Sequence, residues 1–381
     1  MGKKLSFIES MMLMAGAGIG TGMLALPYSI NHIGFFGTIC ALIVAYIATD
    51  IINIYIAELT LKSNGANEIL GIVKQYLPKG KLGKVIGILF FVIVAIVMLH
   101  DLIIYILCAS DILVELFGIS SVLSKIVFYI FASSVIMLGV KGIGVSEKYS
   151  VGFIIVVVTL LSIISWLNPV RTVDFSFGEP KLIFAVYGLF MFAFSSFFSA
   201  IQVANNIEDT KIIRSALSCG LIINAMVTLL FSYAAIIGSK DVTEVATIGI
   251  TNSYGVPWIK IMCSMLVLLA VLSSFWSIGR AFTDMVKEQL KIKEKISWII
   301  CTIPILLIAI FLSRSIIDYV QAGSGILAIA LGIMIIPTYY ILAKNSKDEL
   351  ILGKFGNSKV IMAFETIAMI VMAVSSFIPI D

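Results

Sequence analysis

The sequence predicts an all-helical protein that is embedded in a membrane. Of its 381 residues, 60% are hydrophobic and 13% are charged, whereas soluble domains are roughly 45–50% apolar and about 25% charged. About eleven apolar runs approach the ~20 residues that a helix needs to cross a hydrocarbon core. Four glycines lie inside the first run, within 16–22, and they predict that this helix is broken.

The apolar runs follow one another along the chain, with no polar region large enough for a second domain. We therefore expect one transmembrane domain over 1–381. The expected spans lie at roughly 5–31, 35–61, 85–112, 120–140, 147–167, 181–206, 213–238, 257–286, 296–313, 317–342 and 359–379.

Five spans reverse the topology of a second copy that follows them, because an odd number of crossings ends on the opposite side. We expect an inverted repeat of five plus five spans, with repeat 1 over roughly 5–167, repeat 2 over roughly 181–342 and an extra helix at roughly 359–379. Spans 1 and 6 should then both be broken, in opposite orientations.

Lys and Arg gather in alternate loops between the expected spans. The residues are Lys3, Lys4, Lys62, Lys74, Lys79, Lys81, Lys84, Lys141, Lys148, Lys211, Arg214, Arg280, Lys287, Lys291, Lys293, Lys295, Lys344, Lys347, Lys354 and Lys359. Because cytoplasmic loops carry an excess of Lys and Arg, the pattern predicts a cytoplasmic N-terminus and an external C-terminus at Asp381, in a cell membrane. This bias explains the basic runs without nucleic acid as a partner.

Arrangements that carry enzymatic, metal or nucleotide chemistry are missing from the sequence. The cysteines are Cys40, Cys108, Cys219, Cys263 and Cys301, and they form no Cys-x-x-Cys motif. The two histidines are too far apart for a metal cluster. No glycine-rich loop ends in Gly-Lys-Ser/Thr. We therefore expect neither an enzyme nor a resident cofactor, and an ion gradient rather than ATP as the energy source.

The glycine cluster of span 1 indicates a break near the membrane midplane. Each glycine costs about 1 kcal/mol of helix propensity relative to alanine, and freed backbone groups must find partners within the protein. Such a break can coordinate a polar solute. A packing face of small residues is the alternative, since Gly16 and Gly20 have the required spacing. Gly18 and Gly22 repeat that spacing on another face, so one packing face explains only half of the glycines.

Span 6 carries serines at its middle, within Phe190–Gln202. Ser195, Ser196 and Ser199 can satisfy backbone groups that a local unwinding frees, although serine in membrane helices often bonds its own helix. Since span 6 is the expected counterpart of span 1, we predict a second break here.

Two motifs resemble a known family. Gly20-Thr-Gly-Met-Leu-Ala-Leu-Pro-Tyr28 and Phe192-Ala-Phe-Ser-Ser196, the latter followed by Asn206-Ile-Glu-Asp-Thr210, are similar to the span 1 and span 6 signatures of the amino acid/auxin permease family. That family belongs to the amino acid–polyamine–organocation superfamily and has the LeuT-type fold. The resemblance covers essentially the whole chain and implies a secondary active transporter that imports an amino acid by alternating access. Many relatives carry a proline after the span 6 break, where this chain has Gln202-Val-Ala-Asn.

The resemblance also implies where the substrate binds. The half of span 1 after the break begins near Met23, and its free amides suit a carboxylate. The first half of span 6 ends near Phe194, and its carbonyl groups suit an ammonium group. Glycine would allow close approach and positive φ. Carboxylate binding falls to Gly18, Ile19, Gly20, Thr21 and Gly22, and ammonium binding to Ala17, Phe194 and Ser195.

A set of mostly apolar residues would line the substrate's side chain. These are Ile104, Cys108, Phe190, Phe194, Phe275 and either Gly323 or Ser324. They favour a neutral amino acid, large or aromatic, although such residues line almost every membrane interior.

Sodium and a proton compete as the coupling ion. The stretch Ala270–Ser277 resembles the hydroxyl-bearing part of sodium-coupled LeuT-type transporters, which implies a sodium site with ligands from Gly16, Ile19, Ser273, Ser274 and Ser277. Ordinary packing of serines explains the same residues. Some proton-coupled relatives place a lysine in span 5, and matching Gly144-Val-Ser-Glu-Lys148 to the start of that span puts Thr159 at its position.

Asp101 is the candidate for a proton site, because an ionisable side chain in mid-span is costly and is functional by default. A structural pair with a polar neighbour such as His100 is the alternative. Asp50 poses the same question, and Glu58 lies where it can support the span 6 break or reach water.

Charged residues at the inner end of span 8 follow helical spacing. Arg280 and Asp284 are neighbours, as are Asp284 and Glu288. Lys3 or Lys4 can close a gate onto the acidic residues, while a solvated helix end is the simpler interpretation.

The functional alternatives are a proton-coupled rather than a sodium-coupled transporter, and an amino acid sensor of the same fold that does not transport. An intramembrane enzyme has no supporting residue arrangement. The oligomeric state and the identity of the amino acid stay open.

Overall fold

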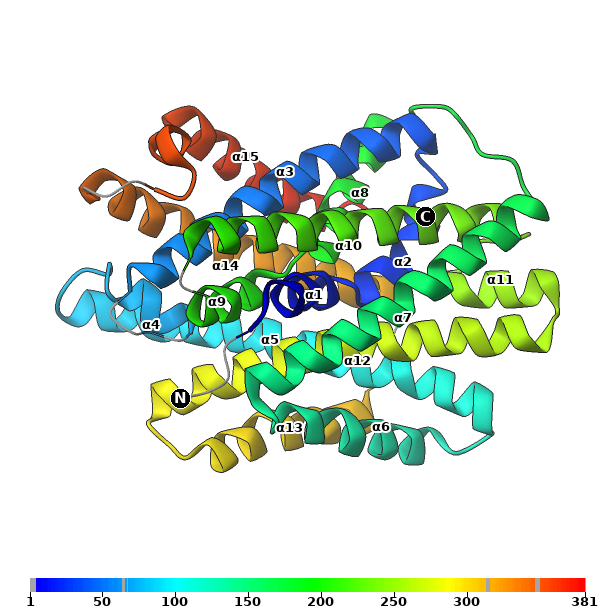
Figure 1. The fold of residues 1–381 in the computed structure, drawn as a ribbon, viewed down its shortest axis with the longest axis horizontal. Coiled ribbons are helices and arrows are strands. Elements are labelled where there is room, and N and C mark those ends of the chain that lie inside the picture. The colour runs from blue at the N-terminus through cyan, green and yellow to red at the C-terminus, as the bar shows by residue number, and fades with distance from the viewer. Residues whose placement is uncertain are drawn as a thin grey trace.

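In the computed structural model, the described residues are 5–63, 66, 68–207, 209–312, 316–346 and 350–380, without the side chains of 316–321. Within these ranges every regular element is a helix (Figure 1). The helices are α1 (Phe7–Gly18), α2 (Thr21–Ile30), α3 (Gly34–Leu61), α4 (Ile69–Lys74), α5 (Lys81–Phe117), α6 (Ser121–Ile136), α7 (Gly139–Leu167), α8 (Pro180–Ala193), α9 (Phe197–Asn206), α10 (Thr210–Gly238), α11 (Ala246–Tyr254), α12 (Pro257–Leu290), α13 (Glu294–Phe311), α14 (Ile316–Asn345), the 3₁₀ helix η1 (Gly353–Asn357) and α15 (Lys359–Ser375). The predicted all-α class is confirmed.

Each of the predicted spans is occupied by helix, but not all pass a test of length and hydropathy. Among the described residues, eight helices are long and apolar enough to cross a membrane, one of them formed by α8 and α9 together, and the bent pair of α1 and α2 adds a ninth. The remaining two, α6 with 16 residues and α15 with 17, are shorter.

Several boundaries differ from the prediction. The short elements α4, α11 and η1 were not expected, since five to nine residues give no long apolar run. Helix α7 begins at Gly139, about eight residues before the predicted start of span 5. Lys141 at its first turn forms an ion pair with Glu9 of α1, so polar residues that lower the local hydropathy still belong to the helix.

The broken span formed by α1 and α2 lies in the middle of the bundle (Figure 1). Helix α1 contacts α7, α9, α10 and α12, and α2 contacts α8 and α10. Because helices surround it on all these sides, polar groups released at the break meet protein rather than lipid.

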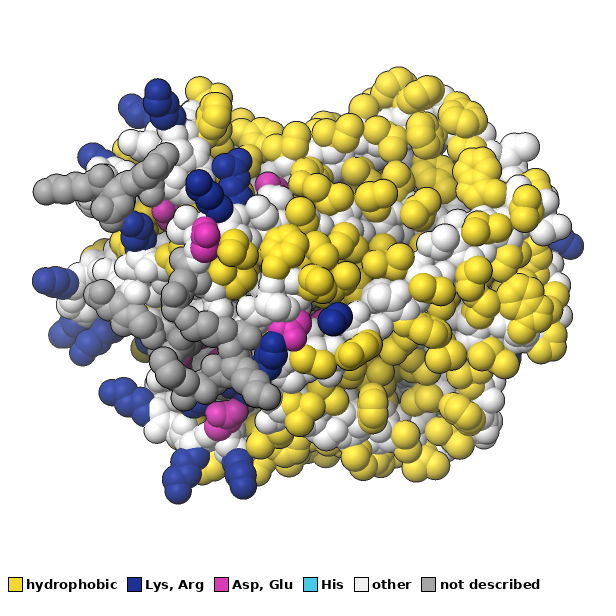
Figure 2. Space-filling model, in the orientation of Figure 1, with side chains coloured by type: hydrophobic (Ala, Val, Ile, Leu, Met, Phe, Trp, Pro, Cys, Tyr) yellow, Lys and Arg dark blue, Asp and Glu magenta, His cyan; other side chains and the backbone are white. Residues whose placement is uncertain are grey.

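Lys and Arg gather at one end of the molecule, while apolar side chains cover most of the remaining visible face (Figure 2). We call this the basic end; it is formed by α4, the start of α5, the end of α12 and η1. The apolar surface of the molecule, which we call the apolar belt, includes exposed side chains such as Ile43, Val92, Leu160 and Ile303. An apolar belt of this kind is what a lipid bilayer requires of the surface it contacts.

Candidate functional site

The predicted break in span 1 is confirmed. Helix α1 ends at Gly18, α2 begins at Thr21, and their axes are bent by 54°. Ile19 leaves helical geometry at φ −76° and ψ 80°. Gly20, the residue before α2, offers no side-chain cap, and its own amide donates to the carbonyl of Gly18 at 2.9 Å. The first amides of α2 therefore lack helical acceptors.

The reason for the glycines differs from the one predicted. None of Gly16, Gly18, Gly20 and Gly22 has a positive φ. A Cβ on Gly22 would lie 2.8 Å from Ala193 Cα, one on Gly18 would lie 2.7 Å from the Ala193 carbonyl oxygen, and one on Gly20 would lie 2.5 Å from Ser274 Oγ. The expectation of positive φ is therefore wrong, and close packing against other helices excludes larger residues.

The predicted break in span 6 is also confirmed, between Ala193 at the end of α8 and Phe197 at the start of α9. Ser195 bonds locally, with its amide and Oγ donating to the Phe192 carbonyl at 3.0 and 2.5 Å. Ser196 Oγ donates to the Met14 carbonyl of α1 at 2.7 Å. Ser199 is buried, and no hydrogen-bond partner of its Oγ is described, so it is not among the groups that satisfy the break.

Asn224 of α10, which sequence analysis missed, completes the second break. Its Nδ2 donates to the carbonyl of Ala193 at 2.9 Å, and its Oδ1 accepts from Thr228 at 3.1 Å. A single Asn in the middle of an apolar span could have indicated a buried polar contact from the sequence alone. The side chain is 0% exposed, so α10 holds the end of α8 through a bond shielded from water.

The two breaks lie side by side. Gly22 packs on Ala193, and the Ser196 bond to Met14 crosses from one break to the other. The start of α2 thus adjoins the end of α8, which brings a positive and a negative helix dipole end together. The Phe194 carbonyl accepts only a long bond of 3.4 Å from Ser196 Oγ among the described contacts.

Four of the five predicted sodium ligands converge. Ser273 Oγ donates to the Gly16 carbonyl at 3.0 Å and is 3.4 Å from that of Ile19. Ser274 Oγ lies 3.3 Å from both carbonyl oxygens and 3.2 Å from that of Ala17. Hydroxyls and carbonyls form such bonds with or without an ion, and the group contains no charged side chain. These contacts alone therefore assign no metal here, and the described residues contain no group of three or more His, Cys, Asp or Glu that could hold one.

Ser277 turns away from this group and donates to Glu147 Oε1 of α7 at 3.2 Å. Glu147 is 0% exposed, and its Oε2 has no hydrogen-bond partner among the described residues. Sequence analysis overlooked Glu147, because it lay at the predicted start of its span rather than two turns inside the helix.

The position assigned to Thr159 is wrong. Its side chain is exposed and donates to the Ile155 carbonyl of its own helix. The α7 residue that reaches the α1 break is Glu147, which packs against Gly16.

One face of α5 approaches the breaks. Asp101, Ile104, Tyr105 and Cys108 are spaced as one helical stripe, and all are buried. The Tyr105 ring lies 3.4 Å from where a Cβ on Gly20 would stand, so this residue, which the prediction omitted, approaches the first break.

Two aromatic residues at the end of α8 lie beside the same region. Phe190 and Phe194 are both 0% exposed, with ring centroids 5.6 Å apart. Phe275 packs edge-on against Phe128 of α6, with ring centroids 5.8 Å apart. Successive helical residues point about 100° apart, so Phe275 points in another direction than Ser274, which faces α1. Its contact with the substrate stays a prediction.

The family match decides what kind of protein this is. The model of the tryptophan/tyrosine permease family matches residues 3–379. The chain belongs to this family. It is therefore an amino acid permease and a multi-pass membrane protein, not an enzyme. The coarser part of the sequence resemblance, an amino acid permease, is thus right, while the amino acid/auxin permease label is not confirmed.

Similar proteins agree with this assignment. "Glutamine transporter 2" of Aliivibrio fischeri (strain ATCC 700601 / ES114) is 24% identical over 353 residues, which cover 89% of each chain. MhsT, solved in complex with L-phenylalanine, has a TM-score of 0.68 at 16% identity, covering 98% of this chain and 100% of its own. Mhp1, a nucleobase-cation-symport-1 family transporter solved in a closed conformation with bromovinylhydantoin bound, has a TM-score of 0.69 at 12% identity, covering 99% and 92%. The permease therefore has the LeuT-type fold.

Asp101 and His100 of the permease form a pair, with Asp101 buried and His100 partly buried. The two side chains lie 3.4 Å apart, Nδ1 to Oδ1. The His100 ring also lies 2.8 Å from where a Cβ on Gly323 would stand, so Gly323 of α14 meets α5 near the α8 break. Ser324 is buried beside it.

The other predicted acidic residues have structural partners. Asp50 accepts from Ser218 of α10 at 2.8 Å. Glu58 accepts from the amide of Ile351 at 2.8 Å, so it neither supports the break nor reaches water as predicted. It ties α3 to the segment after α14.

The predicted Arg280–Asp284 pair is confirmed, with Arg280 Nη2 2.7 Å from Asp284 Oδ1. Arg280 Nη1 also donates to Glu294 at 2.6 Å, a partner that the prediction missed. With Arg280 only 8% exposed, this is a largely buried network rather than a solvated helix end. Lys3 and Lys4, the proposed gate residues, lie outside the described residues, as do Glu208, Lys347 and Asp381.

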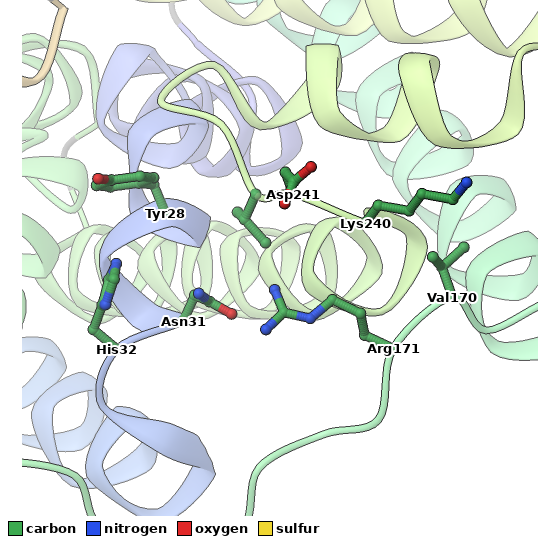
Figure 3. Close-up of a pocket in the computed structure, with 8 residues that line it drawn as sticks. Tyr28, Asn31, His32, Val170, Arg171, Lys240 and Asp241 are labelled. Carbon is green, nitrogen blue, oxygen red and sulfur yellow. The ribbon is translucent and has the colours of Figure 1, made fainter.

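A polar pocket of about 530 Å³ lies at the end opposite the basic end. Figure 3 shows Asn31 and Arg171 pointing toward one another across it, with Tyr28 and His32 on one side. Its lining residues are Tyr28, Asn31, His32, Val170, Arg171, Lys240, Asp241 and Val242. Since α2 ends at Ile30, this helix leads from the first break to the pocket.

Proposed function

We propose that the permease imports a neutral amino acid with a large, aromatic side chain by ion-coupled alternating access across a cell membrane. The observation that carries the proposal is the pairing of the uncapped start of α2 with the end of α8. Opposite helix ends side by side match the two charges of an amino acid zwitterion.

The carboxylate would bind at the first break, held by backbone amides from Gly18 to Gly22. Thr21 and Gly22, at the start of α2, supply donors without helical acceptors. The ammonium group would donate to the carbonyls of Ala17 and Phe194 and to Ser195 Oγ. Ser195 already uses its hydrogen on Phe192, so its oxygen is free to accept.

The side chain would lie against Phe190 and Phe194, with Ile104, Tyr105 and Cys108 of α5 opposite. Aromatic pairs favour another ring in offset or edge contact. The family description names tryptophan and tyrosine, whereas the curated relative is a glutamine transporter. The buried aromatic pair favours the former class.

Alternating access would move α1, α2, α3, α8, α9 and α10 as one body against α5, α6, α12 and α13. Contacts within the first group involve tightly packed backbone, as between Gly22 and Ala193. Contacts across to α12 run through the hydroxyls of Ser273 and Ser274, which can release one partner and take another. We assign the basic end to the cytoplasm, which places the N-terminus inside and the C-terminus outside.

Uptake by purified protein in liposomes tests the proposal. Labelled tryptophan, tyrosine and glutamine are compared under an inward proton gradient, an inward sodium gradient and no gradient. We expect concentrative uptake of an aromatic amino acid under one gradient. Binding without accumulation under every gradient would replace the transporter with the sensor, and accumulation of glutamine alone would contradict the aromatic assignment.

A further inference from the structure

Glu147 of α7 is an acidic residue that the proposed cycle has not yet used. Its side chain is 0% exposed. Ser277 Oγ donates to Oε1 at 3.2 Å, and Oε2 has no partner in the described part of the chain. Burying an ionised carboxylate is costly unless a cation or several donors face it. One hydroxyl compensates little, so the surroundings suit a neutral, protonated carboxyl group.

Charged groups on the neighbouring helices do not neutralise Glu147. Helix α7 packs against α1, α6, α10 and α12. The charged side chains of these helices have other neighbours or are exposed. Ion pairs join Glu9 to Lys141, Arg280 to Asp284 and Glu294, Lys287 to Glu294, and Lys260 to Glu115. Lys125 faces Asp111 and Glu288 faces Glu68, while Lys148, Lys211 and Arg214 are exposed. The described contacts thus leave Ser277 as the hydrogen-bond partner of Glu147.

The carboxyl group lies against the turn of α1 that leads into the first break. A Cβ on Gly16 would stand 2.8 Å from Glu147 Cδ and 3.0 Å from Val151 Cγ2. The Gly16 carbonyl accepts from Ser273, and α1 ends two residues later at Gly18. Ser277 follows Ser273 by one helical turn on α12. Movement of α1 away from α7 and α12 would therefore admit water to Oε2.

We propose that Glu147 carries the coupling proton of the permease. In this structure the proton is bonded to Oε2. When α1 moves away, the O–H bond breaks, the proton passes to water and the carboxylate remains, until a proton from the other side restores it. Closing α1 over a charged carboxylate is unfavourable, so closure and protonation are linked. The Glu147 carboxyl group lies against Gly16, and among the described residues its hydrogen-bond partner is Ser277 alone, whereas a hard metal cation requires several oxygen ligands.

Glu147 is better placed than Asp101 for this role. Asp101 has His100 as a neighbour at 3.4 Å, and it lies on α5. Glu147 contacts the broken span itself, so its proton responds directly to movement of α1.

The test rests on the proposed function and uses Glu147→Gln in the full chain. Tritiated tryptophan is followed in liposomes in two assays: accumulation driven by an inward proton gradient, and counterflow, in which trapped unlabelled tryptophan exchanges for label without a gradient. We expect Glu147→Gln to lose accumulation, with the internal-to-external ratio falling to about 1, while counterflow persists. Persistent counterflow shows that the variant folds and binds.

Three further variants accompany it. Glu365 of α15 is also 0% exposed, and its carboxylate oxygens have no described partner. The variant Glu365→Gln should keep proton-driven accumulation. Ser277→Ala removes only the donor to Oε1 and should shift the pH dependence of uptake without abolishing it. Asp101→Asn should retain proton-driven accumulation.

The outcomes separate the inference from the proposed function. Accumulation by Glu147→Gln equal to wild type, or wild-type accumulation that follows sodium alone, overturns the proton role. If the wild type moves neither tryptophan nor tyrosine, the proposed function fails, and the protonation of Glu147 is tested by infrared spectroscopy of the purified protein at neutral pH. A protonated-carboxyl band that Glu147→Gln removes supports a proton on Glu147, and no such loss overturns it.

Discussion

The two breaks of the permease solve the same problem in different ways. Between α1 and α2 the chain bends by 54°, and glycines let neighbouring helices approach its backbone. Between α8 and α9 the two halves still form one span of 27 residues, and Ser195, Ser196 and Asn224 satisfy local or neighbouring carbonyls. The first break therefore depends on the absence of side chains, and the second on their presence.

The neighbours of the two breaks also differ, and they indicate which break has contacts that change during alternating access. The backbone at the first break accepts hydrogen bonds from α12, and Gly16 beside it packs on α7. Both α12 and α7 lie outside the group of helices that we propose to move as one body. The second break is held by α10 and by α1, both inside it. We infer that the first break, where the carboxylate would bind, is also the one whose contacts change with the coupling ion, whereas the contacts of the second break stay within the moving body.

The largest effect is expected from filling the first break with a side chain. Gly18→Ala would place a Cβ 2.7 Å from the Ala193 carbonyl oxygen, and backbone cannot yield as a side chain can. We expect a loss of about 1–3 kcal/mol of stability and loss of uptake, measured by thermal unfolding in detergent and by liposome assays.

Gly152 supplies the matched control, because a Cβ there meets nothing within 4 Å. Gly152→Ala should be neutral or gain up to about 1 kcal/mol of helix propensity. If Gly18→Ala were as stable and as active as this control, close packing would not explain the glycines.

Removing the hydroxyls that face the first break should have the next largest effect. Ser273→Ala with Ser274→Ala deletes the α12 donors to Gly16, Ala17 and Ile19. Since each bond contributes about 1 kcal/mol, we expect about a tenfold fall or more in gradient-driven uptake. Thr283→Val, which loses a bond to Gly279 of its own helix, is the control. Unchanged gradient-driven uptake would end the sodium-site prediction.

A smaller contrast is expected within the second break. Ser196→Ala removes the bond to Met14 that joins the breaks, whereas Ser195→Ala removes a bond to Phe192 three residues away. We expect Ser196→Ala to weaken tryptophan binding by about fivefold, the equivalent of about 1 kcal/mol. Ser195→Ala also removes the proposed acceptor of the ammonium group, and because hydrogen bonds to charged groups contribute about 1.5–3 kcal/mol, it should weaken binding more. Calorimetric titration measures both. Equal losses would mean that Ser195 does not hold the ammonium group.

The smallest effect concerns a site beside α4, at the basic end, and sets the baseline for the others. Glu68, whose carboxylate caps α4 and accepts from Gln289 of α12, is desolvated by burial, which raises its pKa from 4.5 to about 7. Between these values the folded protein holds the proton more tightly than the unfolded chain, so stability falls as pH rises through that window.

Glu68→Gln cannot ionise, and its melting temperature should change less between about pH 4.5 and 7 than that of the wild type. Uptake at constant gradient should stay near wild type. A steeper fall of the melting temperature in Glu68→Gln would contradict the assignment.

Most of the fold could be predicted because membrane helices follow from simple patterns. Apolar runs of fixed length located the spans, and Gly16–Gly22 and Ser195–Ser196 located both breaks. The elements that were missed are short, as with α4 and α11, or begin in polar sequence, as with α7. Hydropathy measures the contact with lipid, not the extent of a helix.

The candidate site was predictable only where a motif named its residues. Gly16, Ile19, Ser273 and Ser274 do converge, as the resemblance implied. Glu147 was missed through the error in the start of α7. Asn224 and Phe275 depended on helix rotation, which one apolar sequence does not reveal, since almost every face of these helices is hydrophobic.

The contact of Gly22 with Ala193, together with the Asn224 bond, has a consequence for how such proteins diversify. The backbone groups proposed to hold the amino and carboxyl ends are locked together, so neither can shift to suit a different substrate. New specificities would have to arise at side chains such as Phe190, Phe194 and Cys108. A shared backbone site for the amino and carboxyl groups, combined with variable side chains around the substrate's side chain, would let one fold serve relatives named for glutamine and for tryptophan or tyrosine.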